Sequence, residues 1–171
     1  MIPEEFFAMN EIKVRPYRSE DLTRLQDIAQ EAWREIFLGY REQIGDDLFE
    51  QSRPDPECKR KEVLYRAQNT PDCIVVAEDA DGKILGFATY NLDFEHKIGE
   101  ISSNAVDKTL GVKGVGQAMY AELFRRFKAA GMTAAKVTTG LDDGHAPARR
   151  AYQRAGFGEL SLSSITYFKK L

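Results

Sequence analysis

The stretch between residues 73 and 106 constrains the fold most, because strand-like segments follow one another in it at short intervals. The segments "CIVVAED" (73–79) and "ILGFATYNLD" (84–93) are rich in β-branched and aromatic residues. Asp81-Gly82 between them is typical of a tight hairpin turn. A further segment, "IGEISSNAV" (98–106), follows after a short connection. Strands joined in this way pair antiparallel, so this region predicts an antiparallel sheet.

Segments with helical periodicity lie on both sides of these strands. From the N-terminus the predicted order is a strand at 12–17, helices within 19–33, 38–51 and 56–68, the strands at 73–79, 84–93 and 98–106, a helix that ends at Gly131, a strand at 134–139, a helix at 146–156 and a last strand at 163–171. The late strand–helix–strand crossover adds a parallel strand to an antiparallel sheet. The sequence therefore predicts an α/β (α+β) fold with a mixed, mostly antiparallel central sheet flanked by helices.

Length and composition favour one domain and exclude several functional classes. The 171 residues, 43% of them hydrophobic, fit a single domain over 1–171 with a loose end at 1–10. A net charge of −3 without a basic tract argues against nucleic-acid and anionic-membrane partners. Two cysteines outside any CxxC and two histidines form neither a disulfide framework nor a usual zinc site. Because no signal peptide or long apolar run is present, we expect a soluble, cytoplasmic protein.

The glycine-rich segment "TLGVKGVGQAMY" (109–120) has the spacing GxxGxG and leads directly into a helical pattern. Two of its glycines match GxxxxGK[ST], but Gln117-Ala118 stand where a P-loop needs Lys and Ser or Thr. The dinucleotide fingerprint GxGxxG fails on the order of the glycines. A helix N-terminus remains, whose backbone N–H groups suit a pyrophosphate, with Lys113 as an added charge. A plain glycine-rich turn is the alternative at this point.

A second motif, "HAPARRAYQRAGF" (145–157), lies further along the chain. Together with Val106-Asp107, the glycine-rich loop and the strand at 134–139, its pattern A-x-x-x-Y-x-x-x-G-F resembles the GNAT-type N-acetyltransferases. The specific part of the resemblance runs from about residue 100 to 157. It implies acetyl-CoA or another acyl-CoA as donor, a primary amine of a small molecule or peptide as acceptor, and no metal. A homodimer is compatible with it, although no residue pattern here requires one.

The resemblance also implies which residues bind the cofactor. In this family a loop with the pattern [RQ]-x-x-G-x-[GA] binds the CoA pyrophosphate through its backbone N–H groups, and the end of the preceding strand pairs with the pantetheine arm. The family tyrosine lies near the thioester sulfur. Carried over, the predicted cofactor-binding residues are Ala105, Val106, Gly111, Val112, Lys113, Gly114, Val115, Gly116, Gln117, His145 and Tyr152.

Two departures from the family pattern affect cofactor binding. Gly111 stands where the family usually has Arg or Gln, so one phosphate-contacting side chain is absent. His145 stands where Asn is common, and an imidazole replaces one of the two hydrogen bonds of an amide but not both at once. Both departures are compatible with weaker CoA binding, and neither implies its loss.

The chemistry of amine acylation needs a base and an acid. An alkylammonium with a pKa near ~10.4 must lose a proton before it attacks, and a thiolate leaving group of pKa about 8.5 can take one up. Tyr152 is the predicted general acid; packing within the alanine stripe of its helix is the alternative. Glu100, which shares a strand face with Ser102 and Asn104, is the predicted base, directly or through water. A solvated strand carboxylate is the alternative for Glu100.

Acceptor and activity remain open from the sequence. Aromatic and acidic residues in the first two predicted helices would suit a cationic amine with an apolar part, but buried aromatics and a solvated acidic turn explain them better; these residues are Trp33, Phe37, Tyr40, Asp46 and Asp47. The main alternative to a transferase is a non-catalytic acyl-CoA-binding or sensor domain. A protein-interaction module with a vestigial loop is a third function class.

Overall fold

A five-stranded sheet in the order β1-β2-β3-β4-β5 forms the centre of the protein in the computed structural model, which describes residues 12–158. The strands are β1 (Lys13–Pro16), β2 (Ile74–Glu78), β3 (Ile84–Asp93), β4 (Ile98–Val106) and β5 (Ala134–Val137). Neighbouring strands from β1 to β4 are antiparallel, and β4 and β5 are parallel. The predicted mixed, mostly antiparallel sheet is confirmed. The expected loose end at 1–10 and the expected strand at 163–171 lie outside the described residues.

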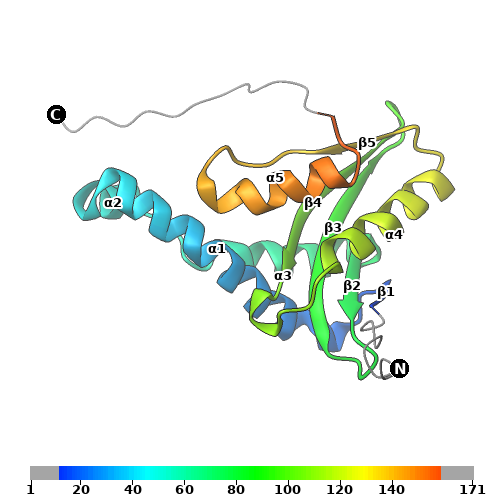
Figure 1. Cartoon of the computed structure of the whole chain (residues 1–171), viewed down its shortest axis with the longest axis horizontal. Coiled ribbons are helices and arrows are strands. Elements are labelled where there is room, and N and C mark those ends of the chain that lie inside the picture. Colours follow the sequence, from blue (N-terminus) through cyan, green and yellow to red (C-terminus); the bar gives the residue numbers. More distant parts are fainter. Residues whose placement is uncertain (1–11, 159–171) are drawn as a thin grey trace, which may run out of the picture.

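Helices cover both faces of this sheet (Figure 1). The helices are α1 (Leu22–Ile44), α2 (Asp46–Gln51), α3 (Cys58–Asn69), α4 (Val115–Ala129) and α5 (Ala146–Arg154), with 3-10 turns η2 (Ser19–Asp21), η3 (Pro71–Cys73), η4 (Lys108–Leu110) and η5 (Asp143–His145). Strand β2 shows why two layers form, since all its residues are buried. Ile74 and Val76 pack toward α1 and α3, whereas Val75 and Ala77 pack toward α4. Between residues 12 and 158, no helix is long and apolar enough to cross a membrane.

Helix α1 is longer than the sequence predicted. We expected a separate helix within 38–51, but α1 continues through Gly39 to Ile44 and α2 occupies only 46–51. A glycine inside a helix costs about 1 kcal/mol relative to alanine, which packing of the helix outweighs here. Gly45, whose φ is 78°, ends α1 in its place. The longer α1 brings Trp33 and Ile36 to the cleft described below.

A β-bulge in β4 reverses which residues share a face. Ser103 pairs with Thr89, but Ile101 pairs with the next residue of β3, Tyr90, so that Ser102 is an extra residue in β4. As a result Ile101 packs in the core on the α4 side, while Ala105 packs in the core on the α1 side. The prediction of one common face along the whole of this strand was wrong, because strict alternation does not survive a bulge.

Strands β4 and β5 separate after a short parallel pairing. The last pair is Ile101 with Val137, where β5 ends, while β4 continues to Val106. Thr138 and Thr139, which the sequence placed in the strand, lie beyond its end and line the cleft instead. The second half of β4 therefore pairs only with β3 among the described strands, and its other edge opens toward the cleft.

A buried ion cluster joins the start of α1 to the sheet. Arg15 of β1 donates from Nη1 and Nη2 to the Asp21 carboxylate at 2.7 and 2.9 Å, and from Nε to Glu78 at 2.6 Å. The three side chains are buried. Burial opposes ionisation of Asp21, but hydrogen bonds from Arg15 and from the Arg18 N–H outweigh it and lower the pKa of the carboxyl.

We expect Asp21→Asn to destabilise the protein at pH 7 by about 3 kcal/mol, because it leaves the buried Arg15 charge partly uncompensated. Because the pKa of Asp21 is lowered by folding, its stabilising effect is complete above the unfolded value of about 3.9 and is lost as pH falls through the folded value. Urea unfolding should therefore show a large difference between wild type and variant at pH 7 that shrinks below about pH 4. A difference that is independent of pH would contradict this role.

Candidate active site

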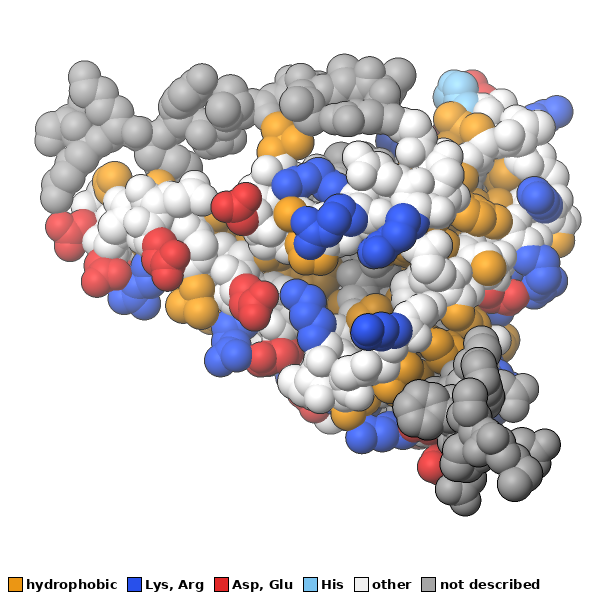
Figure 2. Space-filling model, viewed as in Figure 1, with side chains coloured by type: hydrophobic (Ala, Val, Ile, Leu, Met, Phe, Trp, Pro, Cys, Tyr) orange, Lys and Arg blue, Asp and Glu red, His pale blue; other side chains and the backbone are white. Residues whose placement is uncertain are grey.

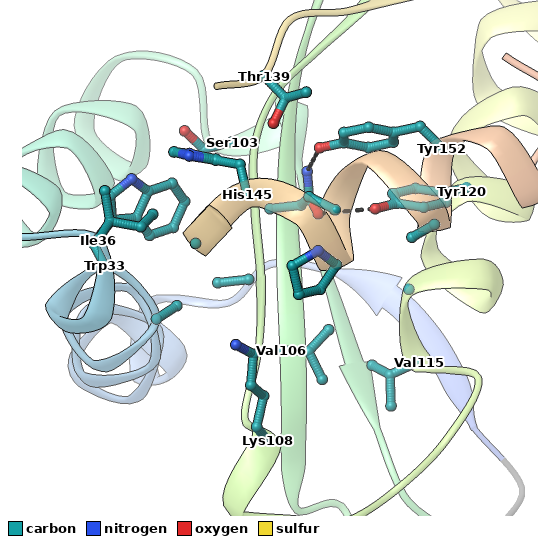
Figure 3. A pocket seen from close by; sticks show the side chains of 18 of the residues that line it. Trp33, Ile36, Ser103, Val106, Lys108, Val115, Tyr120, Thr139, His145 and Tyr152 are labelled. Carbon is teal, nitrogen blue, oxygen red and sulfur yellow. Dashed lines mark hydrogen bonds between the residues drawn. The ribbon is translucent and has the colours of Figure 1, made fainter. Parts of the chain in front are cut away.

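A cleft of about 310 Å³ lies where β4 and β5 separate. In the space-filling view, Lys and Arg side chains gather around the centre of the displayed face (Figure 2). It is bounded by α1, the second half of β4, the start of α4, the segment after β5, and α5 (Figure 3). Segments distant in the sequence thus converge on one cavity. The motifs at 109–120 and 145–157 both contribute to its lining.

The glycine-rich loop forms an open helix N-terminus at one side of this cleft. Gly111 and Gly114 have left-handed φ values of 65° and 86°, which glycine adopts without strain. No side chain caps α4, and its first intrahelical bond is donated by Ala118 to Gly114. The N–H groups of Val115, Gly116 and Gln117 therefore have no partner within the helix and carry its positive dipole end.

The space around the loop fits a phosphate-bearing group. A Cβ at Gly111 would meet nothing within 4 Å, and one at Gly114 would meet only the Ile12 Cδ1 atom at 3.8 Å. The loop is thus open on its outer side, and the N–H groups of the helix start are accessible to an anion. With the free edge of β4 beside it, this is a suitable arrangement for the pyrophosphate and amide groups of CoA.

The structure brings most of the predicted cofactor-binding residues together. The cleft is lined by Ala105, Val106, Val112, Gly114, Val115, Gly116, His145 and Tyr152. Gly111 and Lys113 are exposed on the loop outside this lining. Gln117 donates from Nε2 to the carbonyl of Ala151 at 3.0 Å, which connects α4 to α5.

Tyr152 belongs to a hydrogen-bonded chain of three side chains within the cleft (Figure 3). The Tyr120 hydroxyl donates to Asn104 Oδ1 at 3.0 Å, and Asn104 Nδ2 donates to the Tyr152 hydroxyl at 2.8 Å. Because Tyr152 accepts this bond, its own hydroxyl proton is left for a partner in the cleft. The tyrosine is therefore oriented as a hydrogen-bond donor.

Burial keeps both phenols of this chain protonated. It raises the pKa of Tyr152, an effect that the neighbouring Asn104 amide and Tyr120 hydroxyl only partly offset. Burial also raises the pKa of Tyr120, and the neighbouring Tyr152 adds to this. At neutral pH Tyr152 thus holds a proton that it can donate.

Sequence reasoning missed the roles of Asn104 and Tyr120. Asn104 was expected on the face of Glu100, but the bulge at Ser102 turns it toward α4 and α5. Tyr120 was assigned only to the apolar face of its helix, from which its hydroxyl reaches Asn104. The one signal in the sequence for this hydrogen-bonded chain was the position of Asn104, a polar residue near the end of the strand that precedes the glycine-rich loop.

Glu100 lies outside the cleft lining. Its carboxylate is 2.9 Å from the Lys136 Nζ atom of β5. Glu100 pairs with Asn91 in β3, whose amide donates to Ser102, so these residues lie on one face while Asn104 lies on the other. A direct approach of Glu100 to groups in the cleft is therefore not seen, and a route through water stays a prediction.

Of the residues expected to form an acceptor wall, only Trp33 lines the cleft. The Nζ atom of Lys59 lies 4.5 Å from the centre of the Trp33 ring. Asp46 instead accepts a hydrogen bond from Arg41 at 2.6 Å, outside the cleft. Residues 12–158 contain no cluster of three or more His, Cys, Asp or Glu side chains suited to a metal ion.

Comparison with known proteins identifies the family of proteins to which the fold and the cleft belong. Residues 22–157 match the Acetyltransferase (GNAT) family. The chain therefore belongs to the GNAT acetyltransferase family. No sequence match to a curated protein was found.

Solved structures show the same fold. Ard1 from Thermoplasma volcanium has a TM-score of 0.64 at 18% identity, over 88% of this chain and 84% of that chain. PaiA N-acetyltransferase from Thermoplasma acidophilum, solved with coenzyme A, has a TM-score of 0.64 at 19% identity, over 89% and 92%. AAC(6')-Iy, solved with a bisubstrate analogue, CoA-S-monomethyl-acetylneamine, has a TM-score of 0.58 at 17% identity, over 94% and 99%.

We expect Gly114→Val to weaken CoA binding by at least about tenfold, because a β-branched residue strains the positive φ and displaces the helix N–H groups. Gly82→Val is the matched control, since Gly82 has a φ of 80° in a turn outside the cleft. Calorimetric titration with CoA, with thermal unfolding alongside, checks both variants. Equal CoA affinity in the two variants would contradict this placement of the cofactor.

Proposed function

We propose that this protein is an N-acetyltransferase that moves an acetyl group from acetyl-CoA to a primary amine of a small molecule or peptide. The observation that carries the proposal is the Tyr152 hydroxyl, which lines the cleft, accepts a hydrogen bond from Asn104 and has its pKa raised by burial. It lies in the same cavity as the open start of α4 and the free edge of β4. A proton donor, an anion site and a free strand edge in one cleft support acyl transfer from a thioester.

The cofactor would be held mainly by backbone groups. The N–H groups at the start of α4 would bind the pyrophosphate, and Ala105 and Val106 would pair with the pantetheine amides at the edge of β4. The absence of an Arg or Gln side chain at Gly111 leaves the helix N-terminus and Lys113 as the positive groups of the loop. When bound, acetyl-CoA would supply a thioester whose acetyl group can be transferred to an amine.

Tyr152 would supply the proton that the departing sulfur needs. Its Oη atom holds this proton at neutral pH because burial raises its pKa. The Asn104 amide keeps the phenol in place by donating to Oη at 2.8 Å. As the C–S bond breaks and the amide forms, the attacking nitrogen loses its second proton to water, and water returns a proton to Oη. No nucleophilic side chain is needed: direct attack by the amine is the simplest path.

Amine-dependent release of free thiol from acetyl-CoA tests the proposal. The panel should include primary amines, amino acids, peptides, polyamines and aminoglycosides, the last because AAC(6')-Iy shares the fold. We expect release above an amine-free control with at least one class. Stabilisation by CoA without any release would favour a sensor domain, and the absence of stabilisation would favour an interaction module.

Tyr152→Phe should lower kcat on a basic amine by about 10- to 100-fold and leave CoA affinity nearly intact, because it removes the hydroxyl that carries the transferable proton and keeps the aromatic ring. Tyr65→Phe is the matched control, since Tyr65 is exposed on α3 outside the cleft. Steady-state kinetics and calorimetric titration with CoA measure the two effects. An unchanged kcat would remove Tyr152 from the role of acid.

A further inference from the structure

The cleft contains one side chain that can accept a proton at neutral pH. Its titratable lining residues, within the part of the chain that the structure describes, are Lys108, Tyr120, His145 and Tyr152, and none is a carboxylate. Lys108 is a cation 3.5 Å from Glu35, and burial raises the pKa of both tyrosines. His145 therefore stands alone as a base in this cavity.

An ionised carboxylate sets the protonation of His145. Asp142 Oδ2 lies 2.6 Å from His145 Nδ1, and Asp142 Oδ1 accepts from the His145 backbone N–H at 3.2 Å. Burial opposes ionisation of Asp142, but its hydrogen bonds with His145 outweigh this and lower its pKa. Because an ionised carboxylate only accepts hydrogen bonds, Nδ1 carries the proton and the lone pair of the neutral ring is at Nε2. That atom has no hydrogen-bond partner among the described residues.

The loop around this pair is shaped to hold it. Arg149 of α5 donates to the carbonyls of Gly140 and Asp142 at 2.6 and 2.8 Å. A Cβ at Gly140 would lie 2.5 Å from both Asp142 Oδ2 and His145 Nδ1, so that any side chain there would displace the pair. From α1, the titratable Tyr40 faces Asp142. Arg149 and Tyr40 are thus the groups that approach the pair from the neighbouring helices.

We propose that His145, positioned by Asp142, is the base that removes the proton from the acceptor amine. The proposal rests on the N-acetyltransferase function above. In Figure 3 His145 lies on the side of the cleft with Trp33 and Ser103, across from Tyr120 and Tyr152. An amine entering there would have His145 on one side and the acid Tyr152 on the other.

His145 would take up one proton of the acceptor ammonium ion. The N–H bond of the ammonium breaks, its electron pair stays on the nitrogen as the attacking lone pair, and the proton becomes bonded to His145 Nε2. The Asp142 carboxylate stabilises the imidazolium, which then loses a proton to water. This role differs from the hydrogen bond to the cofactor that the family resemblance implied for His145.

The chain provides a matched control for this pair. The second histidine, His96, lies 2.8 Å from Asp93 through the same atoms, Nδ1 and Oδ2. This pair is exposed in the turn before β4 and does not line the cleft. His96→Gln removes an Asp-paired imidazole without touching the site.

The test is the pH dependence of kcat/KM for an amine that the panel identifies. We expect His145→Gln to lower kcat/KM at pH 7 by about 100-fold and to abolish the acidic limb of the profile. Asp142→Asn should move that limb to lower pH, since it removes the charge that stabilises the imidazolium. His96→Gln should behave as wild type.

A second readout is independent of turnover. Because the chain has two histidines, His145 carries the one imidazole of the His96→Gln variant, and NMR can titrate it alone. Its titration midpoint should match the acidic limb, and both should fall together when Asp142→Asn is added. CoA affinity of His145→Gln, measured by calorimetry, should stay within about twofold of wild type, a difference of roughly 0.4 kcal/mol.

Several results would overturn the inference. His145→Gln with an intact acidic limb would do so, as would loss of CoA affinity with unchanged kcat, which would make His145 a cofactor ligand. Loss of the limb in Glu100→Gln but not in His145→Gln would assign the base to Glu100. In each of these cases wild type still acetylates an amine and the proposed function stands. If wild type shows no amine-dependent thiol release at all, the proposed function fails and this inference fails with it.

Discussion

The separation of β4 from β5 is the constraint on which the rest of the structure depends. The two strands pair only as far as Ile101 and Val137, and the bulge at Ser102 begins where that pairing stops. The parting strands open a cavity in the sheet, expose one edge of β4 and turn Asn104 toward Tyr152. A regular β4 would have sent Asn104 to the opposite face, away from both tyrosines. The bulge and the separation of the strands therefore open the cleft and also bring Asn104 into position to orient Tyr152.

Hydrogen bonds to the side chains that line the cleft orient a proton donor on one side and a proton acceptor on the other. On one side, Tyr120 and Asn104 direct the Tyr152 proton inward; on the other, Asp142 holds the Nδ1 proton of His145 and leaves Nε2 as acceptor. Low exposure makes these arrangements effective, because few competing waters reach the groups. Helix α1 closes the cavity, and the buried Arg15 cluster anchors the start of that helix to β1 and β2. Helix α1 therefore contributes both to the stability of the fold and to the geometry of the cleft.

Features that depend on neighbouring residues in the chain were predictable. The hairpin strands, the glycine loop and the helix around Tyr152 follow from local patterns of turn residues, alternation and helix ends. Two predictions that needed longer-range information were wrong. The break expected before residue 38 is absent because packing carries α1 through Gly39, and the common face of Glu100 and Asn104 is lost to the bulge. Neither packing nor a bulge leaves a strong local signature.

By itself the sequence determined the mixed sheet, the open helix start after the glycine loop and the position of Tyr152 on a short helix, since each follows from backbone preferences of adjacent residues. Only the tertiary structure decided which groups meet in the cleft. Asn104 and Tyr120 reach Tyr152 from β4 and α4, and Glu100 is drawn to Lys136 on β5. The acidic partner of His145 is close in sequence, but its importance appears only when α1, β4 and α5 enclose the ring. The protonation of each group depends on its burial and on partners that folding brings together. Both are set by the three-dimensional packing of the chain, and the order of residues along the chain does not reveal them.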